Sequence, residues 1–221
     1  MQLARAMEIV TRKVIVNAEH SKRAWNVMLA AIEANKIPVD KVLELFEDYK
    51  ITLLHLACRC EDVSVAVVQR LLELGASSSW ADRSGNVAMH KAAQGCDYNS
   101  FEKCKMLPAA DLGCRNSHQQ TPLHVLAHDL KFCVLYHADI RTRRLEDMLR
   151  WMVDTVECPV DAVDMKGRTA ADILCMNGTA APYASIVHSA AIWKRRWTPQ
   201  RAAWIAACCK PCPPLPLGSS F

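Results

Sequence analysis

Three histidines recur at nearly constant spacing, and their ring nitrogens could bind a metal ion or form hydrogen bonds. His55, His90 and His124 lie 35 and 34 residues apart, each within a short run of mostly apolar residues. A metal ion binds ligand atoms at about 2.0–2.3 Å, whereas neighbouring packed helices lie about 8–10 Å apart. We therefore interpret the histidines as hydrogen-bonding groups that join successive units, and we predict no metal site.

The cysteines give no pattern that is typical of a catalytic or zinc site. There are 11 cysteines at irregular spacings, and the lone C-x-x-C pair at Cys209 and Cys212 has no second pair to complete four zinc ligands. Glycine-rich phosphate-binding loops are also absent from the sequence. We expect reduced thiols in a cytoplasmic or nuclear protein, with no enzymatic activity and no cofactor.

The histidines belong to a repeated motif whose clearest copy is residues 121–127, Thr-Pro-Leu-His-Val-Leu-Ala. Threonine can cap a helix, proline suits the first helical position, and the leucine and alanine share one helix face. Related runs begin at Thr52, Val87 and Thr169, where Asp172 replaces the histidine. Asp172 follows His124 by 48 residues, which indicates an insertion of about 15 residues into a repeat of about 33.

With these motifs, the chain resembles ankyrin-repeat proteins over residues 47 to about 178. Residues 82–86 and 164–168 fit the Asp-x-x-Gly-x turn that precedes the Thr-Pro-Leu-His motif in that family, although Lys50 and Gln119 replace the turn glycine in two copies. The resemblance implies an all-α fold, an ankyrin-type helical solenoid of stacked helix pairs with short β-hairpin tips and helical N- and C-terminal caps.

We expect three segments along the chain. Residues 1–46 form a helical N-terminal cap, because terminal repeats are usually atypical. Residues 47–197 hold about four repeats, with an insertion near 130–144 that lengthens the connection after a helix ending near Asp129. Residues 198–221 form a short basic helix with Trp and Cys, followed by a proline-rich tail that cannot be helical.

The basic charge lies at the C-terminal end of the sequence. The net charge is +4, yet no acidic residue follows Asp172, and five basic residues do: Lys194, Arg195, Arg196, Arg201 and Lys210. The rest of the chain therefore has a net charge of about −1, and a basic segment this short does not favour nucleic-acid binding. No run of 18 apolar residues predicts a membrane-spanning helix.

Two interpretations of the C-terminal segment stay open. Its tryptophans could cover the end of the repeat stack as a capping helix. Alternatively, tryptophans, basic residues and cysteines together suit peripheral membrane contact through residues 193–212, with acyl chains on Cys208, Cys209 and Cys212.

The ankyrin resemblance implies protein binding by a monomeric scaffold or adaptor, whose partner is another protein. A membrane-tethered adaptor is the alternative. In the family, the turn tips and first helices form a concave binding surface. The residues predicted to contact the partner are Arg59, Arg83, Ser84, Asn86, Gln94, His118, Gln119, His128, Lys166 and Arg168.

Overall fold

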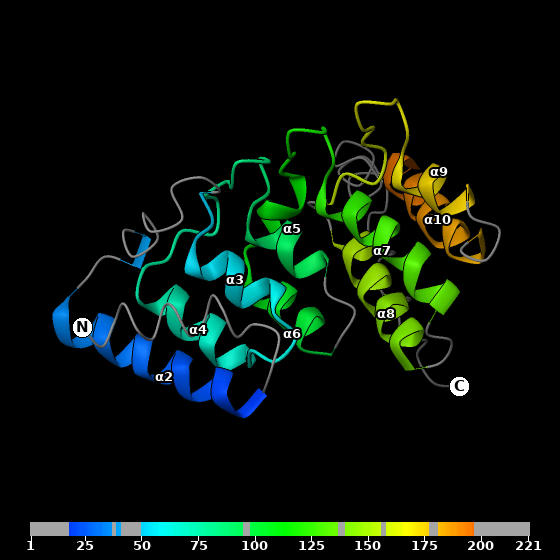
Figure 1. The fold of residues 1–221 in the computed structure, drawn as a ribbon. Coiled ribbons are helices and arrows are strands. Elements are labelled where there is room, and N and C mark those ends of the chain that lie inside the picture. The colour runs from blue at the N-terminus through cyan, green and yellow to red at the C-terminus, as the bar shows by residue number, and fades with distance from the viewer. Residues whose placement is uncertain are drawn as a thin grey trace, which may run out of the picture.

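All regular elements among the described residues are helical (Figure 1). The computed structural model describes residues 18–36, 39–40, 50–94, 98–136, 140–155, 158–176 and 181–196. The helices are α2 (Ala18–Asn35), α3 (Leu53–Arg59), α4 (Val65–Glu73), α5 (Ala88–Ala93), α6 (Tyr98–Met106), the 3₁₀ helix η2 (Ala109–Gly113), α7 (Pro122–Tyr136), α8 (Ile140–Asp154), α9 (Ala170–Cys175) and α10 (Ala181–Arg196).

From α3 onward the α-helices form consecutive pairs arranged in two rows (Figure 1). In one row α3 packs on α5, α5 on α7, and α7 on α9. In the other row α4 packs on α6, α6 on α8, and α8 on α10. Helix α2 contacts α4, and an ion pair between Glu33 and Arg70, with 2.7 Å between oxygen and nitrogen, joins the two helices. Each pair therefore packs against the next pair along the chain.

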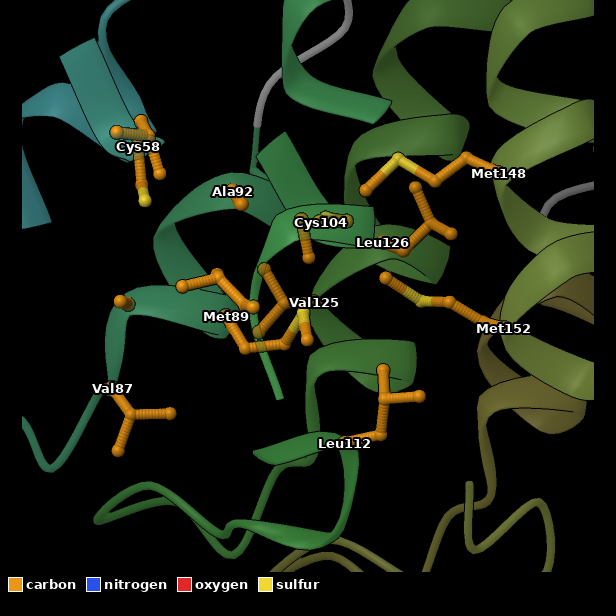
Figure 2. Packing of buried hydrophobic residues seen from close by; sticks show 14 of the residues in the cluster. Cys58, Val87, Met89, Ala92, Cys104, Leu112, Val125, Leu126, Met148 and Met152 are labelled. Carbon is orange, nitrogen blue, oxygen red and sulfur yellow. The ribbon is translucent and has the colours of Figure 1, made fainter. Parts of the chain in front are cut away.

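Apolar side chains fill the space between neighbouring pairs. Figure 2 shows Met89 of α5 beside Val125 of α7, and Met148 and Met152 of α8 directed toward Leu126 of α7. All five side chains are buried. Burying a side chain of this size contributes about 1.5–3 kcal/mol, and because one pair cannot close its own apolar face, stacking supplies the core.

The turns between pairs keep one backbone conformation at the same position. The φ angles are 50° at Lys50, 74° at Gly85, 58° at Gln119 and 70° at Gly167. Lysine and glutamine thus adopt the left-handed conformation that glycine adopts cheaply, at a cost of about 1–2 kcal/mol each. No strand occurs among the described residues; the expected hairpin tips are short turns closed by a few backbone hydrogen bonds.

The prediction that a helix ends near Asp129 is wrong, because α7 continues without a break from Pro122 to Tyr136. No glycine or proline follows Pro122 within this helix, and Leu130 continues the buried stripe of Leu123 and Leu126. Helix α8 is equally long, at 15 residues. The extra residues up to Tyr136 therefore lengthen α7 and do not lengthen the connection that follows it.

Two turn glycines differ in the space around them, which gives a matched test of this geometry. A Cβ atom on Gly85 would lie 2.7 Å from the backbone nitrogen of Ser117, whereas one on Gly167 would meet no atom within 4 Å. We expect Gly167→Ala to lower the free energy of unfolding by about 1–2 kcal/mol, for the positive φ alone. Gly85→Ala should lower the free energy of unfolding by about 1–3 kcal/mol more than Gly167→Ala does, because the added methyl group overlaps the backbone of Ser117.

Urea unfolding followed by circular dichroism measures both values. Equal losses in the two variants would contradict the close approach of successive turns at Gly85.

Candidate functional site

One buried side chain organises each of three successive turns. Asp82, Asn116 and Asp164 occupy equivalent positions, and the Oδ1 atom of each accepts hydrogen bonds from the backbone N–H groups two and four residues later. The distances are 2.8 and 2.8 Å for Asp82, 2.9 and 3.0 Å for Asn116, and 2.8 and 3.0 Å for Asp164. Such side-chain bonds to local backbone hold a turn without a β-ladder.

The two turn carboxylates are neutralised by nearby cations. Lys91 Nζ lies 2.7 Å from Asp82 Oδ2, and Arg168 Nη2 lies 2.7 Å from Asp164 Oδ2. Burial alone would raise both carboxyl pKa values, but the hydrogen bonds from these cations and from the turn backbone lower them more, to about 2 for Asp164. The turn carboxylates therefore stay ionised and face inward.

Hydrogen bonds of the histidine ladder, His55, His90 and His124, connect each helix start to the next turn. Each Nδ1 accepts the backbone N–H of the residue that caps its own helix, at 3.2 Å in all three cases. Each Nε2 contacts the backbone carbonyl just before the next unit's cap residue, at 2.8, 2.9 and 3.1 Å. Because a carbonyl only accepts, Nε2 must carry the hydrogen, and the ring is neutral.

Both ring nitrogens of each ladder histidine are thus engaged by backbone, which leaves no lone pair for a metal ion. In the part of the chain that the structure describes, no group of three or more His, Cys, Asp or Glu side chains could hold a metal. The observed role of the three histidines is to join successive units.

Buried thiols lie in the same core. Cys58 and Cys104 are fully buried, and burial raises the pKa of Cys58 to about 12 and that of Cys104 well above its ordinary value. Both thiols therefore stay protonated at neutral pH, and a protonated thiol is a poor nucleophile.

Successive turns are also bonded directly to one another. The backbone nitrogen of Ser117 donates to the oxygen of Ser84 at 2.9 Å, and that of Met165 donates to the oxygen of His118 at 3.0 Å. The three turns consequently form one continuous edge, which we call the turn edge: the turns at 80–86, 114–120 and 162–168. Figure 1 shows these turns side by side along one side of the helix rows.

Asn86 differs from the other residues predicted for partner binding, because only 8% of it is exposed. Its Nδ2 donates to Asp82, and its Oδ1 accepts a hydrogen bond from Asn116 Nδ2 at 3.0 Å. Asn86 therefore links two turns and does not belong to the exposed surface.

The remaining predicted residues fall into two places. Five exposed side chains share the turn edge: Arg83, Ser84, His118, Gln119 and Lys166. Arg168 is half-buried there and pairs with Asp164. Arg59 and Gln94 are exposed at the far ends of α3 and α5, and His128 is half-buried on α7. The structure thus brings together the turn residues but not the helix residues.

Three exposed turn-edge side chains were not predicted from the sequence. Trp80 and Met165 are 48% and 67% exposed, and Arg115 donates from Nη1 to the carbonyl oxygen of Val163 at 2.7 Å. Trp80 and Arg115 lie just outside the turn motif, so motif matching does not find them. A tryptophan among Ser and Ala before a turn is the signal that could have indicated an exposed aromatic group.

Cys208, Cys209 and Cys212, and the predicted C-terminal helix and tail at 198–221, lie outside the described residues. None of the described helices is long and apolar enough to cross a membrane.

The histidine ladder makes stability depend on pH. Burial lowers the pKa of all three imidazoles below the ordinary 6.5, to about 4 for His90. The unfolded chain therefore binds more protons between these values, and stability should fall as pH drops from about 6.5, by up to about 1.4 kcal/mol per pH unit for each histidine. Asp129 has the opposite effect on the pH dependence of stability, because burial raises its carboxyl pKa to about 7.

The test therefore compares variants over pH 7 to 4.5 by urea unfolding. His90→Asn should reduce this pH dependence of the free energy of unfolding by up to about 1.4 kcal/mol per pH unit. An unchanged slope in His90→Asn would contradict a neutral, buried His90.

Comparison with known proteins agrees with this geometry. The family model of the ankyrin repeat matches residues 49–83, which include α3, α4 and the first residues of the turn at 80–86. A search of curated proteins finds no match to the chain. The capping and turn contacts seen at this repeat recur at α5 and α7. The match confirms the ankyrin repeat that the sequence motifs predict at residues 49–83.

Proposed function

We propose that the chain is a protein-interaction scaffold or adaptor, an ankyrin-type solenoid that binds a partner protein through its turn edge and the adjoining helices α3, α5, α7 and α9. The ankyrin repeat supports a protein-interaction module in general. The observation that carries the proposal is the inward direction of Asp82, Asn116 and Asp164, which hold the turns and leave neighbouring side chains exposed.

The turn positions divide cleanly by role. Asp82 and Asp164 accept hydrogen bonds from the turn backbone and form ion pairs with nearby cations. Arg83, one residue after Asp82, and Lys166, two residues after Asp164, are exposed. Substitutions of exposed side chains usually change stability little, so such side chains can vary to suit a partner. A row of such positions on adjacent turns is therefore suited to recognition.

Alanine substitution at these positions tests the proposal. We expect Arg83→Ala with Lys166→Ala to reduce the amount of partner retained in an affinity pull-down from the native cell type by at least about tenfold, because exposed Arg side chains often dominate interface energies. Thermal unfolding and helicity should match the wild type, since both side chains are exposed.

The matched control is Lys105→Ala with Arg150→Ala, which removes two exposed cations from the outer helices α6 and α8. This control should retain the partner. Equal retention by the turn-edge variant and the wild type would move the binding site away from the turn edge, and loss of folding would show that the two residues belong to the scaffold.

The second candidate function is a membrane-tethered adaptor, supported by the tryptophans, basic residues and cysteines of residues 193–212. Stable anchoring requires two signals, such as acylation at Cys208, Cys209 or Cys212 together with basic residues. Fractionation of cells that express the full chain should then place it with membranes, and a chain ending at Trp197 should be released. A full chain that stays in the soluble fraction contradicts the tether.

A further inference from the structure

We propose that the turn edge binds an extended, acidic segment of the partner, with a carboxylate at about every third residue. The inference rests on the proposed function and specifies the chemistry of the partner. Six exposed side chains of the turn edge carry it: Trp80, Arg83, Arg115, His118, Met165 and Lys166.

The turn edge has exposed cations on each of its three turns. Arg83, Arg115 and Lys166 are exposed, whereas the turn carboxylates of Asp82 and Asp164 are 8% and 6% exposed and engaged in ion pairs. The motif therefore keeps its negative charges inside and presents positive charge outside.

Three exposed cations of the outer helices α4, α6 and α8 differ from those of the turn edge. Each lies beside a carboxylate of its own helix, which balances its charge. These pairs are Arg70 with Glu73, Lys105 with Glu102, and Arg150 with Glu146, at 2.8, 2.6 and 2.7 Å. A negatively charged partner is consequently attracted to Arg115 and Lys166 of the turn edge more than to these three ion pairs.

The spacing of the turns indicates the conformation of the partner. Helices of adjacent pairs pack about 8–10 Å apart, and direct backbone hydrogen bonds link the turns above them. A polyproline II segment rises about 3.1 Å per residue with three residues per turn, so residues i and i+3 share one face about 9 Å apart. Carboxylates three residues apart can thus reach successive turns, whereas a helix offers this spacing only at i and i+7.

Apolar groups flank the cations at both ends of the edge. Trp80 lies before the first of the three turns and Met165 lies in the last, and both are large side chains with about half or more of their surface exposed. An exposed tryptophan supplies a rigid face for a proline ring or an aliphatic side chain. The edge therefore fits an acidic segment that also contains apolar residues.

Fluorescence anisotropy with the full chain and labelled synthetic peptides tests the inference. The probe is four repeats of Glu-Pro-Ser, and the comparison peptide is four repeats of Lys-Pro-Ser. We expect the Glu peptide to bind at least about tenfold more tightly at 50 mM salt, and its affinity to fall at 300 mM salt. Arg83→Glu with Lys166→Glu should weaken binding at least about tenfold, while Lys105→Glu with Arg150→Glu should not.

Each other outcome overturns the inference in a distinct way. Equal affinity for the Glu and Lys peptides contradicts acidic recognition, and tighter binding of a helical peptide with Glu at every seventh position contradicts the extended conformation. Tighter binding of a single-stranded oligonucleotide of equal charge would assign the edge to nucleic acid. Loss of the native partner by Arg83→Ala with Lys166→Ala, together with equal affinity for the Glu and Lys peptides, would leave the proposed function standing and contradict only this inference. Retention of the native partner by that variant, together with no binding of either peptide, would overturn both.

Discussion

The arrangement of the repeats depends on one hydrogen bond, from the Nε2 atom of each ladder histidine to a backbone carbonyl of the next unit. The same imidazole accepts the backbone N–H at the start of its own helix through Nδ1, so its orientation is fixed from both sides. A single bond of this kind contributes about 1 kcal/mol, but its loss would leave a buried donor and acceptor unpaired, which costs more. The start of each helix thereby sets the position of the turn that follows.

Much of the fold could be predicted from the sequence because the cap and turn contacts are local and require specific residue types. The spacing of the histidine motifs also located the turns correctly where glycine is missing, at Lys50 and Gln119, both of which adopt positive φ. The long α7 could not be predicted in this way, since apolar residues of an insertion suit a packed loop and a continued helix equally. Lys103 was also missed: it is fully buried, and its Nζ reaches the carbonyl oxygen of Cys60 at 2.5 Å, at the end of α3.

The candidate site was predictable where exposure follows from position in the motif and not where it depends on distant residues. Arg83 and Lys166 flank a turn-holding aspartate, so the local contacts alone place them outside. Asn86 occupies the same turn, yet its burial depends on Asn116, which is 30 residues later in sequence and meets it only when the units stack. Trp80 lies outside the motif, and its exposure follows from the path of the chain between α4 and the turn.

Asp172 shows what happens when the ladder residue changes while the cap is kept. Its Oδ2 accepts hydrogen bonds from the backbone nitrogen and hydroxyl of Thr169 at 2.8 and 2.7 Å, which reproduces the histidine contacts within the unit. Those bonds from Thr169 lower the carboxyl pKa, so the group is ionised at neutral pH. A carboxylate can only accept hydrogen bonds, and it therefore cannot donate to the carbonyl of a further turn. The fourth unit consequently keeps its helix cap but exposes an acceptor where the earlier units present a donor, so a group that hydrogen-bonds to α9 at this position must supply an N–H or O–H donor.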